Sequence, residues 1–215
     1  VQTCALPIYV LGDPSKDNYQ DDIHMRVMED SDLPAILSKH GIDFREISEH
    51  EQYKLLESPI PELCMDRFDY ACRDFLIVSQ NSGRLERVVN GIINHNGSMA
   101  FNSIESAEEF SMNYVDSQTR NWTSKERRSR YHLFAEALKI ALQKGLIKEE
   151  DFLKTEDYVF EKMIHKEERI DYLLGMLEDG FEVSEVQKGG IPVQFKVRYV
   201  DPAVHHNGET RKLSE

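Results

Sequence analysis

Residues 63–74 read Leu-Cys-Met-Asp-Arg-Phe-Asp-Tyr-Ala-Cys-Arg-Asp, and their spacing predicts a helix around which the rest of the chain is organised. Asp66, Tyr70 and Asp74 stand at positions i, i+4 and i+8, which places them on one face of that helix. The apolar residues that can bury on the other side are Leu63, Phe68, Cys72, Phe75 and Leu76. One helix therefore carries two carboxylates and a phenol beside an apolar face.

The polar face suits two kinds of chemistry. Arg67 borders the face of Asp66, Tyr70 and Asp74, so carboxylates, a phenol and a guanidinium lie together. Carboxylates bind hard divalent cations, and a guanidinium binds phosphate. The same spacing is also typical of a solvated helix face held by ion pairs at i,i+3 and i,i+4. Both interpretations stand on the spacing alone.

The nine residues Asp66–Asp74 (DRFDYACRD) resemble a helix of known enzymes. They are similar to the D-[RK]-x-D-Y-x-x-R-D helix of HD-domain metal-dependent phosphohydrolases, in the branch that includes the deoxynucleoside triphosphate triphosphohydrolases. The resemblance implies a mainly α fold, an HD-domain-like helical bundle around a divalent metal. It also implies that Asp66 is a metal ligand and that Arg67 faces substrate phosphate. Tyr70 and Asp74 are then expected to contact the sugar of a nucleotide.

A histidine upstream extends the resemblance. Residues 21–29 (DDIHMRVME) predict a helix, and His24 resembles the histidine that opens the next helix of the family, near the scissile phosphate. There it is expected to act as a general acid or to orient the phosphate. Many relatives have His-Glu where this chain has His24-Met25, so an ordinary surface histidine stays an equal alternative.

The basic cluster of the chain lies at the start of its longest amphipathic pattern. Residues 123–144 predict a helix, and its first turns read Lys-Glu-Arg-Arg-Ser-Arg-Tyr-His over 125–132. By resemblance, Arg127, Arg128 and Arg130 contact phosphate and Tyr131 stacks on the base or sugar. The alternative is a solvated helix end. Basic residues at a helix N-terminus oppose the macrodipole, which favours a bound anion or an acidic neighbour.

The family's metal set, His…His-Asp…Asp, is incomplete in this sequence. None of the eight histidines is followed by Asp. We therefore expect a C-terminal fragment without the His…His-Asp part, which by itself binds metal weakly and catalyses nothing measurable. Residues 1–8 (VQTCALPI) resemble a translated sequencing adaptor, and we expect them to be non-native.

Two β-hairpins are predicted beside the helices. Apolar runs at 88–93 and 98–103 are joined by Asn94-His95-Asn96-Gly97, and Asn-Gly is the strongest short hairpin signal. From Phe181 to Tyr199 apolar and polar residues alternate, which predicts a second hairpin. We therefore expect a helical domain over 9–180, with a hairpin near 88–103, and a C-terminal hairpin and polar tail over 181–215.

The composition limits the partners. The chain has 39 acidic and 26 basic residues and a net charge of −13, which disfavours nucleic-acid binding. No apolar run is long enough to span a membrane. Three scattered cysteines form no CxxC pair, which fits a reducing cytoplasm. Self-association into a homo-oligomer is left open.

These patterns lead to one functional prediction and one alternative. The prediction is a metal-dependent phosphohydrolase acting on a phosphorylated small molecule, with a deoxynucleotide as the best candidate. Its metal is Mn, Mg, Fe, Ni, Co or Zn, which the ligand types do not separate. In this prediction Asp66, Tyr70 and Asp74 line one pocket with His24 and part of residues 125–131. The alternative is a non-catalytic helical module that senses nucleotides or binds a protein.

Overall fold

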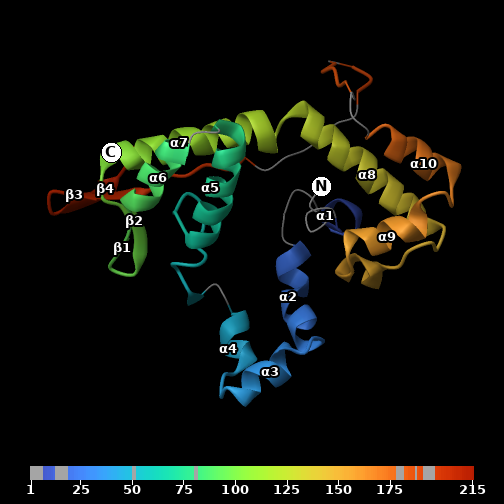
Figure 1. The fold of residues 1–215 in the computed structure, drawn as a ribbon, viewed down its shortest axis with the longest axis horizontal. Helices are drawn as coiled ribbons and strands as arrows, with labels where there is room; N and C mark the ends of the chain where they lie inside the picture. Colours follow the sequence, from blue (N-terminus) through green and yellow to red (C-terminus); the bar gives the residue numbers. More distant parts are fainter. Residues whose placement is uncertain are drawn as a thin grey trace. The chain divides into compact units, whose positions relative to one another are not determined.

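The structure is a computed structural model that describes residues 7–12, 19–49, 52–79, 82–177, 182–186, 188–190 and 197–215. Contacts divide the chain into two units, which we describe separately (Figure 1). Unit 1 comprises residues 1–30 and 123–196, and unit 2 comprises residues 31–122 and 197–215. The sequence predicted boundaries near residues 8 and 180, and that division stays a prediction. Within the described ranges, no helix combines the length and the apolarity needed to cross a bilayer.

Most of the described residues are helical, and a small sheet is added, which confirms the predicted mainly α class. Unit 1 contains only helices within its described residues: α1 (Pro7–Val10), α2 (Tyr19–Glu29), α8 (Lys125–Gln143), η4 (Glu149–Leu153), α9 (Glu156–Met163) and α10 (Glu168–Gly175). Unit 2 contains α3 (Leu33–Lys39), α4 (Phe44–Ser48), α5 (Met65–Ser79), α6 (Ser82–Gly91), β1 (Ile92–His95), β2 (Ser98–Phe101), α7 (Ile104–Ser117), η3 (Gln118–Trp122), β3 (Ala203–His206) and β4 (Glu209–Lys212).

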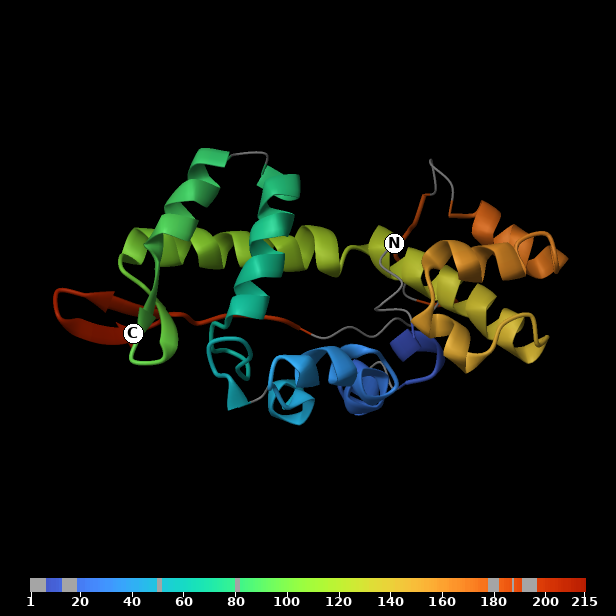
Figure 2. The ribbon, with the colours of Figure 1, turned by 60° about the horizontal axis from the view of Figure 1, so that its bottom comes forward.

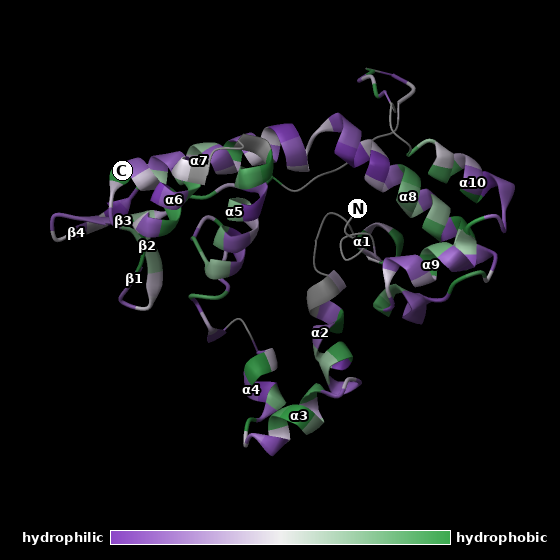
Figure 3. Ribbon diagram, viewed as in Figure 1, coloured by the Kyte–Doolittle hydropathy of each residue, from purple (hydrophilic) through white to green (hydrophobic). Residues whose placement is uncertain are grey.

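Unit 1 is built around α8. The Ser124 hydroxyl caps this helix by accepting a hydrogen bond from the Arg127 amide. The first turns of α8 are hydrophilic and its later turns carry hydrophobic residues (Figure 3). The later turns pack against α9, α10 and Ile147, which lies between α8 and α9 in the chain. The buried residues of this core are Leu133, Phe134, Ala137, Leu138, Ala141, Ile147, Val159, Met163, Ile170 and Leu173.

The N-terminal residues join the same unit. Pro7 and Ile8 belong to α1, whose contacts are with α8 and α2, and Ile8 is buried. The predicted adaptor tail covers these two residues and residues 1–6, which lie outside the described residues. That residues 1–8 are non-native stays a prediction.

Unit 2 packs α5 and α6 against α7 (Figure 2). The predicted helix at 63–74 is confirmed as α5, and Phe68 and Phe75 are buried on its inner side. The expected burial of Leu76 is wrong, because this side chain is 44% exposed. Leu76 follows Phe68 by eight residues, which turns it about 80° around the helix axis and away from the buried stripe.

Two hairpins form one sheet in the order β1-β2-β3-β4. Strands β1 and β2 are antiparallel, as are β3 and β4, and β2 pairs with β3 in parallel. Each hairpin turns at Asn-Gly with both φ angles positive: 52° and 81° at Asn96 and Gly97, and 52° and 82° at Asn207 and Gly208. Two positive φ angles make type I′ turns, for which Asn-Gly is the preferred pair.

The first hairpin was predicted, but its first strand is shorter than expected. Residues 88–91 belong to α6, and β1 begins at Ile92. The second hairpin was predicted over 181–199. The described residues of that range, 182–186, 188–190 and 197–199, form no strand, whereas residues 191–196 lie outside the description. The observed strands lie at 203–212, in the expected polar tail, because the Asn-Gly turn at 207–208 sets the hairpin there.

A buried carboxylate in unit 1 gives a testable prediction. Asp151 accepts hydrogen bonds from Lys162 Nζ at 2.9 and 3.0 Å and from the Lys148 amide at 2.8 Å. The bond with Lys162 is the main cause that lowers the pKa of Asp151 below its ordinary 3.8. The charged carboxylate is therefore favoured in the folded state, so its stabilisation is complete above pH 3.8 and is lost as the pH falls through the lowered pKa.

We expect Asp151→Asn to lower the free energy of unfolding by about 2 kcal/mol at neutral pH. Below pH 3.8 the difference from the wild type should shrink, because the wild-type carboxylate then becomes protonated as well. Urea titrations between pH 2 and pH 7 measure both effects. Asp157→Asn, at an exposed site in α9, is the matched control and should change stability by less than about 0.5 kcal/mol. A deficit of Asp151→Asn that stays constant over this range contradicts the assignment.

Candidate functional site

The predicted polar face of α5 exists in unit 2, but its three residues differ in burial. Asp66 lies in the first turn and is exposed, whereas Tyr70 and Asp74 are half-buried. A carboxylate in the first turn of a helix is stabilised by the positive end of the macrodipole. Asp66 therefore has a structural role of its own, and its role as a metal ligand stays a prediction.

Tyr70 and Asp74 are joined to α7 and η3 by direct hydrogen bonds. The Tyr70 hydroxyl lies 2.8 Å from the hydroxyl of Tyr114, which is buried in α7. The indole N–H of Trp122 donates a hydrogen bond to Asp74 Oδ2. Asp74 and Tyr70 thus gain partners that are 48 and 44 residues away in the sequence. We call these four residues the Tyr-Trp-Asp cluster.

The aromatic rings of the Tyr-Trp-Asp cluster meet edge to face. The Trp122 ring lies 5.5 Å from the ring of Tyr70 and 4.9 Å from that of Tyr114, with interplanar angles of 72° and 79°. Edge-to-face pairs at such distances are favourable because the positive edge of one ring meets the negative face of the other. The cluster is therefore held by ring contacts as well as by hydrogen bonds.

The two phenols of the cluster keep their protons at neutral pH. Burial is the largest cause that raises the pKa of Tyr70, and the hydrogen bond with Tyr114 adds to it. Burial also raises the pKa of Tyr114. A neutral phenol is a hydrogen-bond donor and acceptor, and the Asp74 carboxylate is an acceptor. Tyr70, Asp74 and Trp122 are half-buried and so remain partly accessible, whereas Tyr114 is 1% exposed.

The local geometry comes from a π-helix that continues α7. Segment η3 covers Gln118–Trp122 and precedes α8. A π-turn adds a residue to the helical repeat, which shifts the following side chains around the axis, and such turns are frequent at functional sites. Sequence reasoning did not single out Tyr114 or Trp122 as site residues. The available signal was that Trp122 is the only tryptophan of the chain.

Arg67, which was predicted to face phosphate, is 8% exposed and bonded to the loop before α5. Its guanidinium donates hydrogen bonds to the carbonyl oxygens of Ser58 and Glu62, the former at 3.1 Å, and lies 3.6 Å from the Glu57 carboxylate. It also contacts the buried Cys64 thiol at 3.3 Å. In this structure the guanidinium holds the loop 57–64, so phosphate binding by Arg67 requires some of these bonds to break and stays a prediction.

The other predicted residues belong to unit 1. His24 is half-buried on α2. The Nε atom of Arg127 donates to the Tyr131 hydroxyl at 3.2 Å, and the Tyr131 ring lies 5.9 Å from that of Tyr9. Arg130 donates to the carbonyl oxygen of Leu177. The predicted pocket would bring residues of both units together, and it stays a prediction, as do the roles of these residues.

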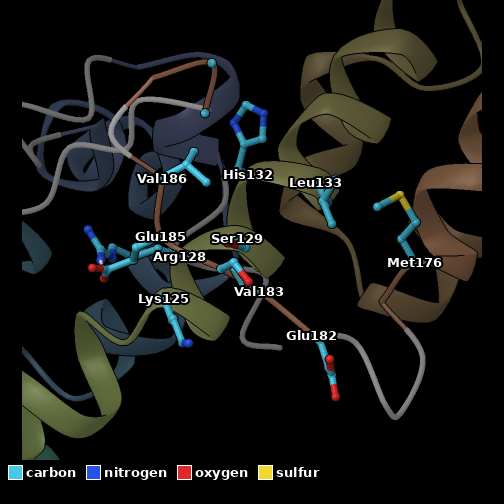
Figure 4. Close-up of a pocket in the computed structure, with 13 residues that line it drawn as sticks. Lys125, Arg128, Ser129, His132, Leu133, Met176, Glu182, Val183, Glu185 and Val186 are labelled. Atoms are coloured by element: carbon cyan, nitrogen blue, oxygen red, sulfur yellow. Dashed lines mark ion pairs between the residues drawn. The ribbon is translucent and has the colours of Figure 1, made fainter.

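A cavity lies beside the basic start of α8 in unit 1. Its volume is about 650 Å³, within the range of small-molecule sites. The side chains from α8 that line it include Lys125, Arg128, Ser129 and His132, and the opposite wall comes from the described part of 182–190 (Figure 4). Arg128 Nη2 lies 3.8 Å from Glu185 Oε1 in the lining of the cavity. Of the four residues predicted to bind substrate on α8, Arg128 lines this cavity.

Comparison with known proteins gives two matches. The chain is 33% identical over 202 residues to the uncharacterized protein YdhJ of Bacillus subtilis, and the match covers 91% of this chain and 61% of YdhJ. A stretch of 66 residues is 39% identical to the metal-dependent phosphohydrolase cns2 of Cordyceps militaris, which covers 31% of this chain and 19% of cns2. The chain thus spans less than two thirds of either relative. No family model and no solved structure matches it.

The similarity to cns2 supports the prediction of a phosphohydrolase, without its substrate. The name of cns2 also implies a metal ion. The described residues do not fit a metal ion, because no three histidine, cysteine, aspartate or glutamate side chains among them lie close enough together to hold one.

The burial of Arg67 gives a prediction that separates its structural role from a ligand-binding role. Without any ligand present, Arg67→Met should lower the free energy of unfolding by about 3 kcal/mol, because buried carbonyl oxygens lose their donor. Arg73→Met is the control on the same helix. Arg73 is 76% exposed and pairs with Asp69 one turn away, so we expect a loss below about 0.5 kcal/mol. Equal stability of the two variants in urea denaturation would mean that Arg67 does not hold the loop.

Proposed function

We propose that the protein is a metal-dependent phosphohydrolase that acts on a deoxynucleoside triphosphate, and that the Tyr-Trp-Asp cluster binds the nucleoside part of this substrate. The observation that carries the proposal is the anchoring of Tyr70 and Asp74 side by side on α5. Both residues resemble sugar contacts of the family, and both are half-buried and held by hydrogen bonds to Tyr114 and Trp122. The similarity to cns2 supports the phosphohydrolase part of the proposal.

The chemistry of the cluster suits a nucleoside. The rings of Tyr70 and Trp122 offer apolar faces and edges against which a sugar or base can pack. The Asp74 carboxylate can accept a hydrogen bond from a sugar hydroxyl, and such a bond to a charged group is stronger than one between neutral groups. A deoxynucleoside with its free hydroxyl meets both requirements.

The phosphate groups need positive charge and a proton donor. We propose that Arg127, Arg128 and Arg130 neutralise phosphate oxygens, since catalysis of phosphoryl transfer rests mainly on positioning and electrostatic stabilisation. His24 is proposed to donate a proton to the leaving group or to orient the phosphate. A cytoplasmic location, the absence of membrane and nucleic-acid partners, and self-association stay predictions of the sequence.

The test is phosphate or triphosphate release from deoxynucleoside triphosphates by the protein at its full natural length, with manganese or magnesium added. Asp74→Asn should raise KM about tenfold with little change in kcat, because the hydrogen bond that it weakens is made to the bound substrate before the reaction as well as during it. Asp66→Ala should abolish release, because this residue is proposed to hold the metal.

Asp69→Ala is the matched control. This exposed carboxylate lies on the same helix, pairs with Arg73 and should leave release unchanged. Nucleotide binding without release would instead support a non-catalytic nucleotide-sensing module. Turnover of simple phosphomonoesters without preference for nucleotides, or full activity of Asp66→Ala, would contradict the proposal.

A further inference from the structure

Trp122 holds the carboxylate of Asp74 in one orientation. The indole N–H bonds Oδ2, and Oδ1 makes no hydrogen bond within the described part of the chain. A carboxylate on a helix can rotate about its side-chain bonds, and a hydrogen bond to a rigid ring removes most of that freedom. One oxygen is therefore held by the protein while the other is left to accept a bond from a ligand.

The indole itself is fixed by its surroundings. It ends the π-helix η3 and meets the rings of Tyr70 and Tyr114 edge to face at 5.5 and 4.9 Å. Tyr114 is 1% exposed and packs against Phe110 at 6.0 Å between ring centres. The position of the Trp122 N–H is thus set by the buried side of α7, and a change at Trp122 reaches Asp74 through the hydrogen bond between them.

We propose that Trp122 is a positioning residue that orients Asp74 to accept a hydrogen bond from the sugar hydroxyl of a deoxynucleotide. This inference rests on the proposed function, since it takes the nucleoside as the ligand of the cluster. In a 2′-deoxynucleoside triphosphate the 3′-hydroxyl is the only free sugar hydroxyl. Trp122 therefore determines how strongly the protein distinguishes such a nucleotide from its 2′,3′-dideoxy analogue.

The test measures binding of deoxyadenosine triphosphate and of dideoxyadenosine triphosphate to residues 1–215 by calorimetry. The wild type should bind the former about tenfold more tightly, as expected for one hydrogen bond to a charged acceptor. Trp122→Phe keeps a ring but removes the N–H, so the ratio of the two affinities should fall to about twofold or less. Any loss of ring packing weakens both nucleotides and leaves that ratio unchanged. A loss of general stability would instead weaken both nucleotides alike.

Asp74→Asn provides the second arm of a double-mutant cycle. It should lower the ratio as Trp122→Phe does, and the double variant should lose no more than either single variant, because both remove the same interaction. If Trp122→Phe does not fold, a tryptophan analogue can be introduced instead, because residues 1–215 contain a single tryptophan. Growth of a tryptophan auxotroph on 3-benzothienylalanine replaces only this side chain and puts sulfur in the place of the N–H.

The outcomes separate this inference from the proposed function. If the affinities for the deoxy and dideoxy nucleotides still differ tenfold after both the Phe and the benzothienyl replacements, Trp122 does not position Asp74, but nucleotide binding is unaffected. Equal binding of the two nucleotides by the wild type also overturns it, because Asp74 then does not bind the hydroxyl. If residues 1–215 bind neither nucleotide, the inference fails, whereas the proposed function is decided separately by release from the protein at its full natural length.

Discussion

The packing of Phe68 on α7 is the contact on which the arrangement of unit 2 depends. Its ring stacks on Phe110 at 5.3 Å and meets Phe101 of β2 at 6.4 Å. Phe110 and Tyr114 are one turn apart on α7, and Tyr70 follows Phe68 by two residues on α5. Once Phe68 is buried, the Tyr70 hydroxyl is brought to Tyr114 and, one turn later, Asp74 is brought to Trp122. The apolar side of the helix thus sets the register of its polar side.

Arg67, beside this contact, is buried and bonded to the loop before α5, whereas Tyr70 and Asp74 of the same helix belong to the Tyr-Trp-Asp cluster. Arg67 lies immediately before Phe68 and is turned into the loop 57–64, where carbonyl oxygens and Glu57 compensate for its loss of water. The same loop holds the C-terminal segment, since Asp201 N donates to the Pro61 carbonyl and Lys212 pairs with Glu62 at 2.6 Å. A residue type that resembles a phosphate ligand in the sequence therefore serves here to join α5 to the sheet.

Of the two hairpins, local sequence preferences predicted the first in its observed place but not the second. The type I′ turn at Asn96-Gly97 was predicted from the dipeptide and its flanking apolar runs, and the same dipeptide at 207–208 makes the second turn. The second hairpin was missed because its strands are polar and only Val204 is deeply buried, whereas the alternating residues before it carried the stronger pattern. Its strands are fixed by pairing with β2 and by contacts such as the 4.1 Å stacking of His95 on His205, which no local pattern contains.

The sequence by itself determined the mainly α class, the helices α5 and α8, the first hairpin, and the placement of Asp66, Tyr70 and Asp74 on one helix face. These features follow from periodicity and turn preferences that act over a few residues. Only the tertiary structure decided that Arg67 is buried, that Asp66 is exposed, and that Trp122 and Tyr114 complete the cluster. Those outcomes depend on which helix covers which face, and hydrogen bonds between residues 44 and 48 positions apart leave no periodic trace in the chain.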